Sequence, residues 1–281
     1  MRHVHVLFVA LLLLAACSTD DTPAPAQPAT LKLYVFDCGM LRFDTLAGFS
    51  VGDDETEIRD LIVPCYMVEH EKGRLLWDGG LPSAVAGGDG MQIEGMHMRL
   101  DRTLAEQLED MNLNMGSFDF MAFSHMHFDH VGVANEVEGA TLLIQQTEYD
   151  AAFADPVTIL GFDPTLYDGL EFADRVLLDG DHDVFGDGKV RIISAPGHTP
   201  GHQVLFIDLE DTGPVVLSGD LYHFAISRED KRVPEFNTDA EQTLESMSRV
   251  EAFVVETGAQ FWIEHEVARF EQLEKAPLYY D

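Results

Sequence analysis

The chain has few positively charged residues: 17 Lys and Arg face 50 Asp and Glu, which gives the 281 residues a formal net charge of −33. Because these cations are scattered and form no basic stretch, we do not expect a nucleic-acid substrate, whose phosphates need a positive groove. Long apolar runs are also scarce. The run at residues 4–16 is shorter than the ~20 residues that cross a membrane. With 46% hydrophobic and 24% charged residues, the remainder has the composition of an ordinary globular protein.

Cysteine is scarce as well, and the three residues present are Cys17, Cys38 and Cys65. None has the close cysteine partner that a thiolate zinc site requires. Cys38 and Cys65 lie in strand-like segments, and their spacing leaves open whether they form a disulfide or remain two separate core thiols.

The first 30 residues differ from the rest of the chain. Residues 1–16 combine a short basic start with the apolar run, which is typical of a secretory signal peptide. The run ends in Leu14-Ala15-Ala16-Cys17, which resembles the lipobox of bacterial lipoproteins; the alternative is an ordinary signal in which Cys17 carries no lipid. Residues 17–30 are rich in Pro and Ala and predict an extended tether. We expect a cell-envelope lipoprotein, periplasm-facing or in the outer membrane, anchored at Cys17, with its folded domain in residues 31–281.

Short apolar strands alternate with turns and a few helices after residue 31, which predicts one α/β domain. Residues 103–111 have helical spacing. The longest predicted helix covers Asp239 to Thr257, where Thr238 and Glu241 suggest a capping box and Gly258 ends the helix. Its expected buried face consists of Leu244, Met247, Val250 and Val254. Strands are expected at residues 31–36, 61–68, 73–77, 118–123, 141–144, 189–194, 203–209, 214–218 and 260–263.

Four metal-binding side chains occur within the short motif HMHFDH, residues 125–130. Side chains two positions apart in an extended chain point the same way, so His125 and His127 can address one ion. If the chain then turns into a helix, Asp129 and His130 point to other sides and can address a second, adjacent ion. Imidazole and carboxylate groups suit Zn²⁺ and similar cations.

Three further candidate ligands each follow a predicted strand. His198 lies in PGHTPGH (residues 196–202), Asp220 ends the sequence SGD, and His265 ends the sequence IEH. All three therefore occupy strand tips, as the first motif does. Seven candidate ligands exceed the four that close a structural zinc site. This excess favours a two-metal catalytic site over a non-catalytic envelope protein that binds metal for its structure.

The motifs HMHFDH, PGHTPGH, SGD and the late EH together resemble the metallo-β-lactamase superfamily. Within it, the strings LYVFDCG (33–39), VPCYMVEHEKGRLLWDGG (63–80), RTLAEQL followed by SHMHFDHVG, and SGDLYH (218–223) are most similar to the N-acyl homoserine lactonase group. The resemblance covers most of the chain from Leu31 onward. It implies an αββα sandwich, in which two mixed β-sheets are flanked by helices and two divalent metal ions lie along one edge.

The resemblance also implies a role for each candidate. It assigns the ligands to two ions bridged by Asp220: His125, His127 and His198 for one ion, and Asp129, His130 and His265 for the other. A hydroxide between the ions would attack the lactone carbonyl, because the metals lower the pKa of bound water. Asp129 would then pass a proton to the leaving alkoxide.

Several positions depart from the family pattern or stand beside it. The family usually has a tyrosine three residues after the bridging aspartate, where it stabilises the oxyanion; here Tyr222 is two residues after Asp220 and His223 is three after. We expect Tyr222 to take the role, with His223 as the alternative. Asp78 is expected to support a ligand or cap the end of a strand, and His202 to support a ligand or have a structural use; neither is expected to bind metal. Residues 81–100, rich in Gly and Met, are expected to form an irregular loop near the site mouth, whose methionines contact an acyl tail or face the core.

These expectations describe an enzyme, a metal-dependent hydrolase that opens a small-molecule lactone, most specifically an N-acyl homoserine lactone in quorum quenching. The alternative is hydrolysis of another ester, a thioester or a β-lactam, because the metal chemistry does not depend on which carbonyl is presented. Zinc is the expected metal, and iron, manganese or cobalt would accept the same ligands. The oligomeric state is left open, with a homodimer as one option.

Overall fold

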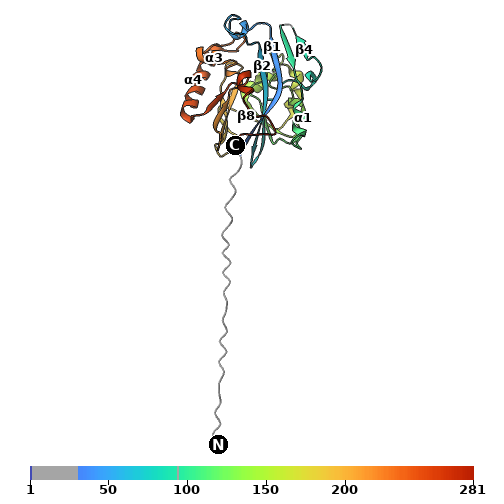
Figure 1. Ribbon diagram of the computed structural model, residues 1–281, viewed down its shortest axis with the longest axis vertical. Coiled ribbons are helices and arrows are strands. Elements are labelled where there is room, and N and C mark those ends of the chain that lie inside the picture. The colour runs from blue at the N-terminus through green and yellow to red at the C-terminus, as the bar shows by residue number, and fades with distance from the viewer. Residues whose placement is uncertain (2–30, 94) are drawn as a thin grey trace.

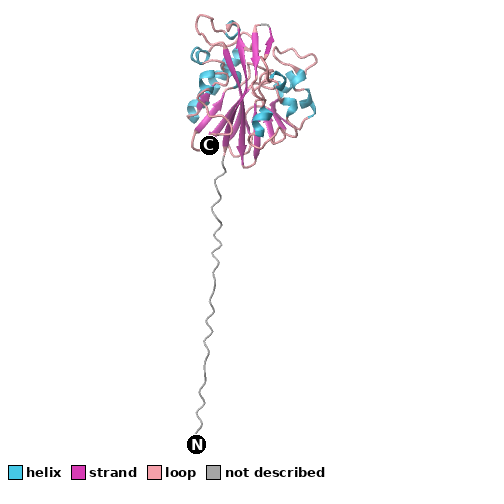
Figure 2. Cartoon of the chain, turned by 45° about the vertical axis from the view of Figure 1, so that its right-hand side comes forward, coloured by secondary structure: helices cyan, strands magenta, loops and turns pink. Residues whose placement is uncertain are grey.

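Two β-sheets packed face to face form the centre of the protein, with helices around them (Figures 1 and 2). The computed structural model describes Met1, residues 31–93 and residues 95–281. Over these residues, the first sheet has eight strands in the order β4-β5-β1-β2-β3-β6-β7-β8, and the second has five in the order β13-β12-β11-β10-β9. This arrangement confirms the predicted αββα sandwich.

Most predicted strands are present with similar bounds, but β1 runs to Phe43, well beyond its predicted end at residue 36. The first sheet contains β1 (Lys32–Phe43), β2 (Asp60–His70), β3 (Gly73–Trp77), β4 (Met91–Ile93), β5 (Met96–Arg99), β6 (Phe120–Ala122), β7 (Thr141–Gln145) and β8 (Arg175–Leu178). The second contains β9 (His182–Asp183), β10 (Val190–Ser194), β11 (Gln203–Leu209), β12 (Gly213–Leu217) and β13 (Gln260–Trp262). The helices are α1 (Leu104–Glu109), α2 (Gln146–Ala152), α3 (Ala225–Asp230), α4 (Ala240–Thr257) and α5 (Val267–Phe270).

Strand direction decides where the polar motifs lie. Strands β1, β2 and β3 are antiparallel neighbours, whereas β3, β6, β7 and β8 run parallel. Parallel strands end at the same edge of a sheet, so the segments that follow β3 and β6 lie side by side. In the second sheet β12 and β13 are also parallel, which brings the segments after them to one edge. The predicted strand tips therefore meet at one side of the sandwich.

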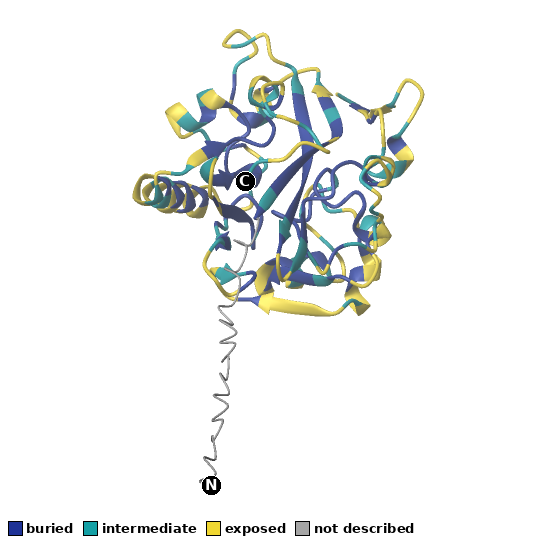
Figure 3. Ribbon diagram, turned by 60° about the horizontal axis from the view of Figure 1, so that its bottom comes forward, coloured by how far each residue is buried: buried dark blue, intermediate teal, exposed yellow. Residues whose placement is uncertain are grey.

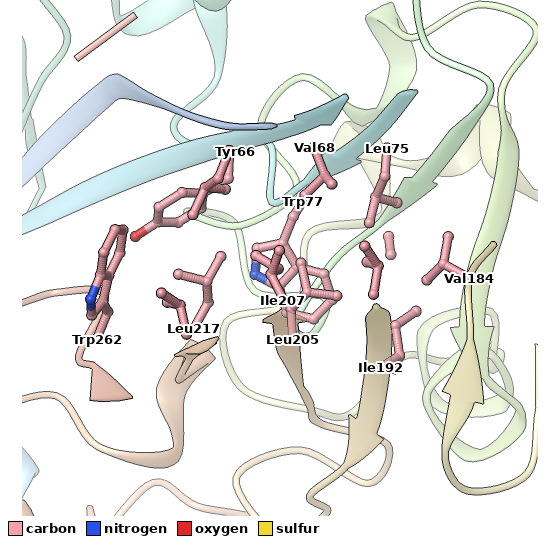
Figure 4. Close-up of a cluster of buried hydrophobic side chains, with 14 of the residues drawn as sticks. Tyr66, Val68, Leu75, Trp77, Val184, Ile192, Leu205, Ile207, Leu217 and Trp262 are labelled. Atoms are coloured by element: carbon pink, nitrogen blue, oxygen red, sulfur yellow. The ribbon is translucent and has the colours of Figure 1, made fainter. Parts of the chain in front are cut away.

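The main core lies between the two sheets (Figure 4). Tyr66 and Trp77 project from the first sheet towards Leu205, Leu217 and Trp262 of the second, and each of these side chains is at most 2% exposed. Burial of each such side chain contributes roughly 1.5–3 kcal/mol. Figure 3 shows the consequence as buried strands at the centre of the fold, with exposed residues concentrated at its periphery.

The long helix α4 covers the outer face of the second sheet, and its expected face is mostly correct. Met247, Val250 and Val254 are buried against that sheet, but Leu244 is 41% exposed and does not belong to the face. The N-cap is Asp239, whose side chain accepts a hydrogen bond from the backbone N–H of Gln242; the predicted capping box one residue earlier is therefore wrong. Gly258 ends the helix with φ 67°, as predicted.

The capping box of this fold lies instead at helix α1. There the Thr103 side chain accepts from the backbone N–H of Glu106, and the Glu106 side chain accepts from that of Thr103. The two reciprocal bonds satisfy N–H groups that the first helical turn leaves without partners.

Two features of the first sheet resolve expectations that the sequence left open or placed elsewhere. Cys38 and Cys65 form a disulfide between the neighbouring strands β1 and β2, with Cα atoms 5.7 Å apart. The segment expected to be an irregular loop, residues 81–100, contains the hairpin β4–β5, which adds to β1 at the sheet edge. Met98 is buried in the adjacent core, so this methionine faces the protein interior.

Over the described residues, no helix is both long and apolar enough to span a membrane. The predicted tether at residues 17–30, including Cys17, lies outside the described residues, as does all of the predicted signal peptide except Met1. These assignments remain predictions.

Candidate metal centre

The structure brings three predicted histidines together at the edge where β6 and β10 end. His125 and His127 follow β6, and His198 follows β10. Their ring nitrogens converge: His125 Nε2 lies 2.8 Å from His127 Nδ1, and His198 Nε2 lies 3.2 Å from each of these atoms. Burial lowers the pKa of His125 and of His127 well below the usual value, so both imidazoles are neutral and can offer lone pairs to a cation.

A second cluster lies next to the first and consists of Asp129, His130 and His265. The Asp129 Oδ2 atom lies 3.7 Å from His130 Nε2 and 3.9 Å from His265 Nε2. All three side chains are buried. His265 reaches this position because it follows β13, whose parallel partner β12 ends at the same edge.

Asp220 stands between the two clusters, one oxygen towards each. Its Oδ2 atom lies 3.2 Å from His198 Nε2, while Oδ1 lies 2.9 Å from His265 Nε2 and 3.2 Å from His130 Nε2. Burial opposes the charge of Asp220, but the surrounding imidazoles, led by those of His223 and His265, hold the pKa of its carboxyl well below the usual value. Asp220 is therefore an anion at neutral pH.

This donor set fits two divalent cations. Among the residues that the structure describes, the buried atoms His130 Nε2 and Asp220 Oδ1 have no hydrogen-bond partner, although the two atoms are only 3.2 Å apart. Buried polar atoms normally have hydrogen-bond partners. A cation is bound by several lone-pair atoms that point at a common space and do not bond to one another. Histidine and carboxylate ligands suit zinc and related metals.

Partners behind the clusters hold each ring in its orientation. Asp78, after β3, accepts a hydrogen bond from the Ser124 backbone N–H at 2.6 Å through Oδ1, and its Oδ2 lies 2.9 Å from His130 Nδ1. His202 Nε2 accepts from the Asp220 backbone N–H at 2.9 Å. Over the described residues, His202 belongs to none of the groups that could hold an ion, whereas Asp78 forms one such group with His130 and Glu264. Such partners fix the tautomer of a ligand and raise its basicity.

Other supporting residues gave no signal in the sequence. Asn237 Oδ1 lies 2.9 Å from His198 Nδ1, and the Ile62 carbonyl lies 2.7 Å from His265 Nδ1. An isolated asparagine and a backbone carbonyl in a strand have no motif that would reveal them.

Glu148, on α2, joins the two histidine-bearing loops and was also missed. Its Oε1 accepts from the Met126 backbone N–H at 2.9 Å, and its Oε2 accepts from the Gly201 backbone N–H at 2.7 Å. The side chain is 1% exposed. One buried carboxylate therefore sets the distance between HMHFDH and PGHTPGH.

The structure corrects the expectation for Tyr222. The Tyr222 backbone is extended (φ −145°, ψ 138°), so Tyr222 and His223 point to opposite sides. Tyr222 packs against Phe261, away from the clusters, whereas His223 Nε2 lies 3.0 Å from Asp220 Oδ2. The alternative residue, His223, is the one that reaches the site.

A cavity of about 80 Å³ lies beside the clusters. Its polar lining residues are His127, Asp129, Asp220, His223 and His265. Its apolar lining residues are Leu41, Phe43, Phe49, Leu61, Phe128 and Phe236. A small ester or lactone in this cavity would therefore meet both carboxylate and imidazole groups and hydrocarbon.

The chain belongs to the metallo-beta-lactamase superfamily, whose family model matches residues 58–257. This confirms the family predicted from the motifs and, with it, the class of metal-dependent hydrolases. Among curated proteins, the chain is 27% identical over 264 residues to the N-acyl homoserine lactonase AttM of Azorhizobium caulinodans, covering 89% of this chain and 99% of that protein. It is 28% identical over 245 residues to an N-acyl homoserine lactonase of a Bacillus species, covering 84% of this chain and 93% of that protein.

Solved structures agree with this placement. An N-acyl homoserine lactone hydrolase, with the product N-hexanoyl-L-homoserine bound at its catalytic metal centre, superposes with a TM-score of 0.76 at 25% identity; the match covers 89% of this chain and 99% of that one. The dizinc quorum-quenching lactonase AidC shares the fold, with a TM-score of 0.65 at 17% identity over 90% of this chain and 97% of its own.

Proposed function

We propose that the protein is a dinuclear metal-dependent lactonase that hydrolyses N-acyl homoserine lactones. The observation that carries this proposal is Asp220, which presents one carboxylate oxygen to each of two histidine-rich clusters beside a mostly apolar cavity. Similarity to lactonases over 89% of the chain supports the substrate class.

The proposed ligands are the side chains whose donor atoms converge. One cation would be held by His125, His127 and His198, the other by Asp129, His130 and His265, and Asp220 would contact both. Zinc is the proposed metal, with iron, manganese and cobalt as alternatives. When bound, the two cations would lower the pKa of a coordinated water and polarise the lactone carbonyl.

The protein side chains would orient the substrate and move the proton. Asp129 lines the cavity and is 6% exposed, so the carboxylate oxygen that does not hold the cation can receive a proton from the attacking water and deliver it to the leaving alkoxide. His223 also lines the cavity, and its Nε2 lies 3.0 Å from Asp220 Oδ2. Once the Asp220 carboxylate is engaged by the cations, this N–H would be available to donate a hydrogen bond to the developing oxyanion.

A substrate panel tests the proposed activity. Purified protein of known metal content is given lactones, thioesters, β-lactams and phosphodiesters, and is tested again after a chelator. We expect acyl homoserine lactones to be the best substrates and the chelator to abolish turnover. A preference for another ester, a thioester or a β-lactam would transfer the proposal to that substrate. Unchanged hydrolysis by His127→Ala would instead favour a structural role for the metal.

The role of His223 has its own test. His223→Phe removes the hydrogen-bond donor and keeps an aromatic ring, so kcat should fall by about 10²–10³-fold, the usual effect of losing one oxyanion donor. His223→Tyr restores a hydroxyl donor at the family position and should recover part of that loss. Tyr222→Phe is the matched control and should leave kcat within about twofold of wild type, because that ring packs away from the cavity. A large loss in Tyr222→Phe would reverse the assignment.

We also propose that the enzyme acts at the cell envelope, tethered through lipid on Cys17. The lipobox-like sequence LAAC and the Pro- and Ala-rich residues after it support this location. In cells, Cys17→Ser should move the protein from the membrane pellet to the soluble fraction. If the variant stays in the pellet, the anchor lies elsewhere.

A further inference from the structure

The cavity beside the clusters is small for an acylated substrate. Its volume is about 80 Å³, whereas sites for drug-sized ligands occupy roughly 300–1,000 Å³. A lactone ring is small enough for this cavity, but a long aliphatic tail is not. The residues that close the cavity therefore decide how much of the acyl substituent can enter.

Two of the phenylalanines that line the cavity come from distant loops and pack on histidine rings of the site. Phe49 lies in the loop between β1 and β2, and Phe236 lies in the loop between α3 and α4. Their ring centroids are 5.2 Å apart with planes at 90°. Phe49 packs on His223 at 4.9 Å between ring centroids, and Phe236 lies 5.9 Å from the rings of both His223 and His198. We call Phe49 and Phe236 the phenylalanine wall.

The two loops are joined to each other, which fixes the wall. The Glu235 backbone N–H donates to the Gly48 carbonyl at 2.8 Å, and Ser50 Oγ donates to the Val233 carbonyl at 2.6 Å. Beside them the Arg232 guanidinium donates to both carboxylate oxygens of Glu55, at 2.7 and 2.8 Å. Gly48 and Ser50 flank Phe49 and Glu235 precedes Phe236, so these contacts hold the backbone that carries each ring.

We propose that the phenylalanine wall is the specificity determinant of this enzyme and restricts it to lactones with short acyl substituents. This inference rests on the proposed lactonase function and specifies its substrate class. A short substituent fits between the wall and the clusters, whereas a longer one must displace Phe49 or Phe236. In an apolar pocket, one methylene too many changes selectivity by roughly 10-fold or more.

The test compares the N-butanoyl and N-decanoyl homoserine lactones and measures the ratio of their kcat/KM values. Wild type should favour the butanoyl substrate. Phe236→Ala and Phe49→Leu should each raise the decanoyl-to-butanoyl ratio by about tenfold or more, the scale of selectivity in apolar pockets. Phe253→Ala is the control. Phe253 is half-buried like Phe236, but it lies on the outer side of the second sheet, where it packs on Phe206, so its loss should leave the ratio unchanged.

A further variant changes the junction and leaves both rings intact. Glu55→Gln weakens its bond to Arg232 without altering any cavity-lining side chain. It should raise the decanoyl-to-butanoyl ratio of kcat/KM by about two- to fivefold, because the loosened loops let the two rings move apart in a fraction of the enzyme molecules. Because Glu55 is exposed, this variant should fold normally, and it tests the proposal even if the ring variants misfold.

The outcomes separate the wall from the function. If lactones are hydrolysed and the ratio is the same in wild type, wall variants and the Phe253 control, the wall proposal is overturned and the lactonase proposal stands. If no lactone is hydrolysed, the same ratio is measured with butanoyl and decanoyl aryl esters. If the aryl-ester ratio changes in the wall variants, the wall proposal is supported and the assignment of a lactone substrate is overturned.

Discussion

Asp78 offers the sharpest test of how the site is held, because one buried carboxylate makes two separable contacts. Its Oδ1 accepts from the Ser124 N–H at 2.6 Å, and its Oδ2 lies 2.9 Å from His130 Nδ1. Asp78→Asn retains the first acceptor and replaces the second with an NH₂ group, which cannot accept from an imidazole N–H. Asn also tolerates the positive φ of 56° at this position. The substitution therefore isolates the bond to His130.

Loss of a partner behind a ligand typically lowers metal affinity by 10–100-fold, equivalent to about 1.4–2.7 kcal/mol. In Asp78→Asn this loss should fall on the cation held by His130, while the cation held by His125 keeps its affinity. Asp78→Ala should show the same loss and, in addition, destabilise the metal-free protein by about 2–5 kcal/mol. That cost combines an unsatisfied buried N–H of Ser124 with the poorer tolerance of Ala, compared with Asp, for the left-handed region.

The assay is titration of metal-free protein with zinc against a chromophoric chelator, which resolves two sites of different affinity. Urea unfolding of the metal-free variants measures the stability effect separately. Two tight sites in Asp78→Asn, as in wild type, would refute the reasoning. Equal loss at both sites would also refute it, since Asp78 contacts a ligand of only one cluster.

Three other predictions concern the scaffold. The disulfide closes a separation of 27 residues, so Cys38→Ala with Cys65→Ala should lower the free energy of unfolding by about 3 kcal/mol, and added reductant should do the same to wild type in urea melts. Glu148→Ala leaves two buried backbone N–H groups without acceptors and should cost about 2–6 kcal/mol; Glu148→Gln keeps one acceptor and should cost less, and equal losses would contradict this account. The hydrogen bond from Arg232 lowers the pKa of Glu55 to about 2. The stabilisation that this pair contributes should therefore be complete above about pH 4.3, the unfolded value, and be lost as the pH falls through 2. Carboxyl NMR of wild type measures this pKa, with Glu55→Gln to identify the signal, and a normal pKa of Glu55 would show that the pair does not form in solution.

Periodicity and motif spacing predicted the parts of the fold that depend on local pattern. Strands β3 and β11 have the predicted bounds, and Gly258 ends α4 as expected. The seven clustered side chains were found because histidine and aspartate at strand tips are rare without a chemical use. Local sequence pattern was enough to predict an element where its neighbours in the fold only bury its apolar face and do not change its bounds.

The errors occur where a contact from elsewhere in the chain decides the outcome. Leu244 has the right spacing for the buried face of α4, yet it lies where nothing covers the helix. The hairpin β4–β5 forms because β1 offers its edge, which a Gly-rich segment does not reveal. Tyr222 was assigned to the site by type, but its extended backbone alternates the two side chains and presents His223 instead. Asn237 and Glu148 act through backbone and ring contacts that leave no motif.

Strand β1 has a practical consequence through its length. It begins at Lys32, where the folded domain starts, and its far end supplies Leu41 and Phe43 to the cavity wall. At about 3.3 Å per residue, these ends are roughly 30 Å apart. A bead or fusion partner joined directly to the domain at Lys32 would thus stand on the side remote from the cavity and would leave the cavity open to solutes.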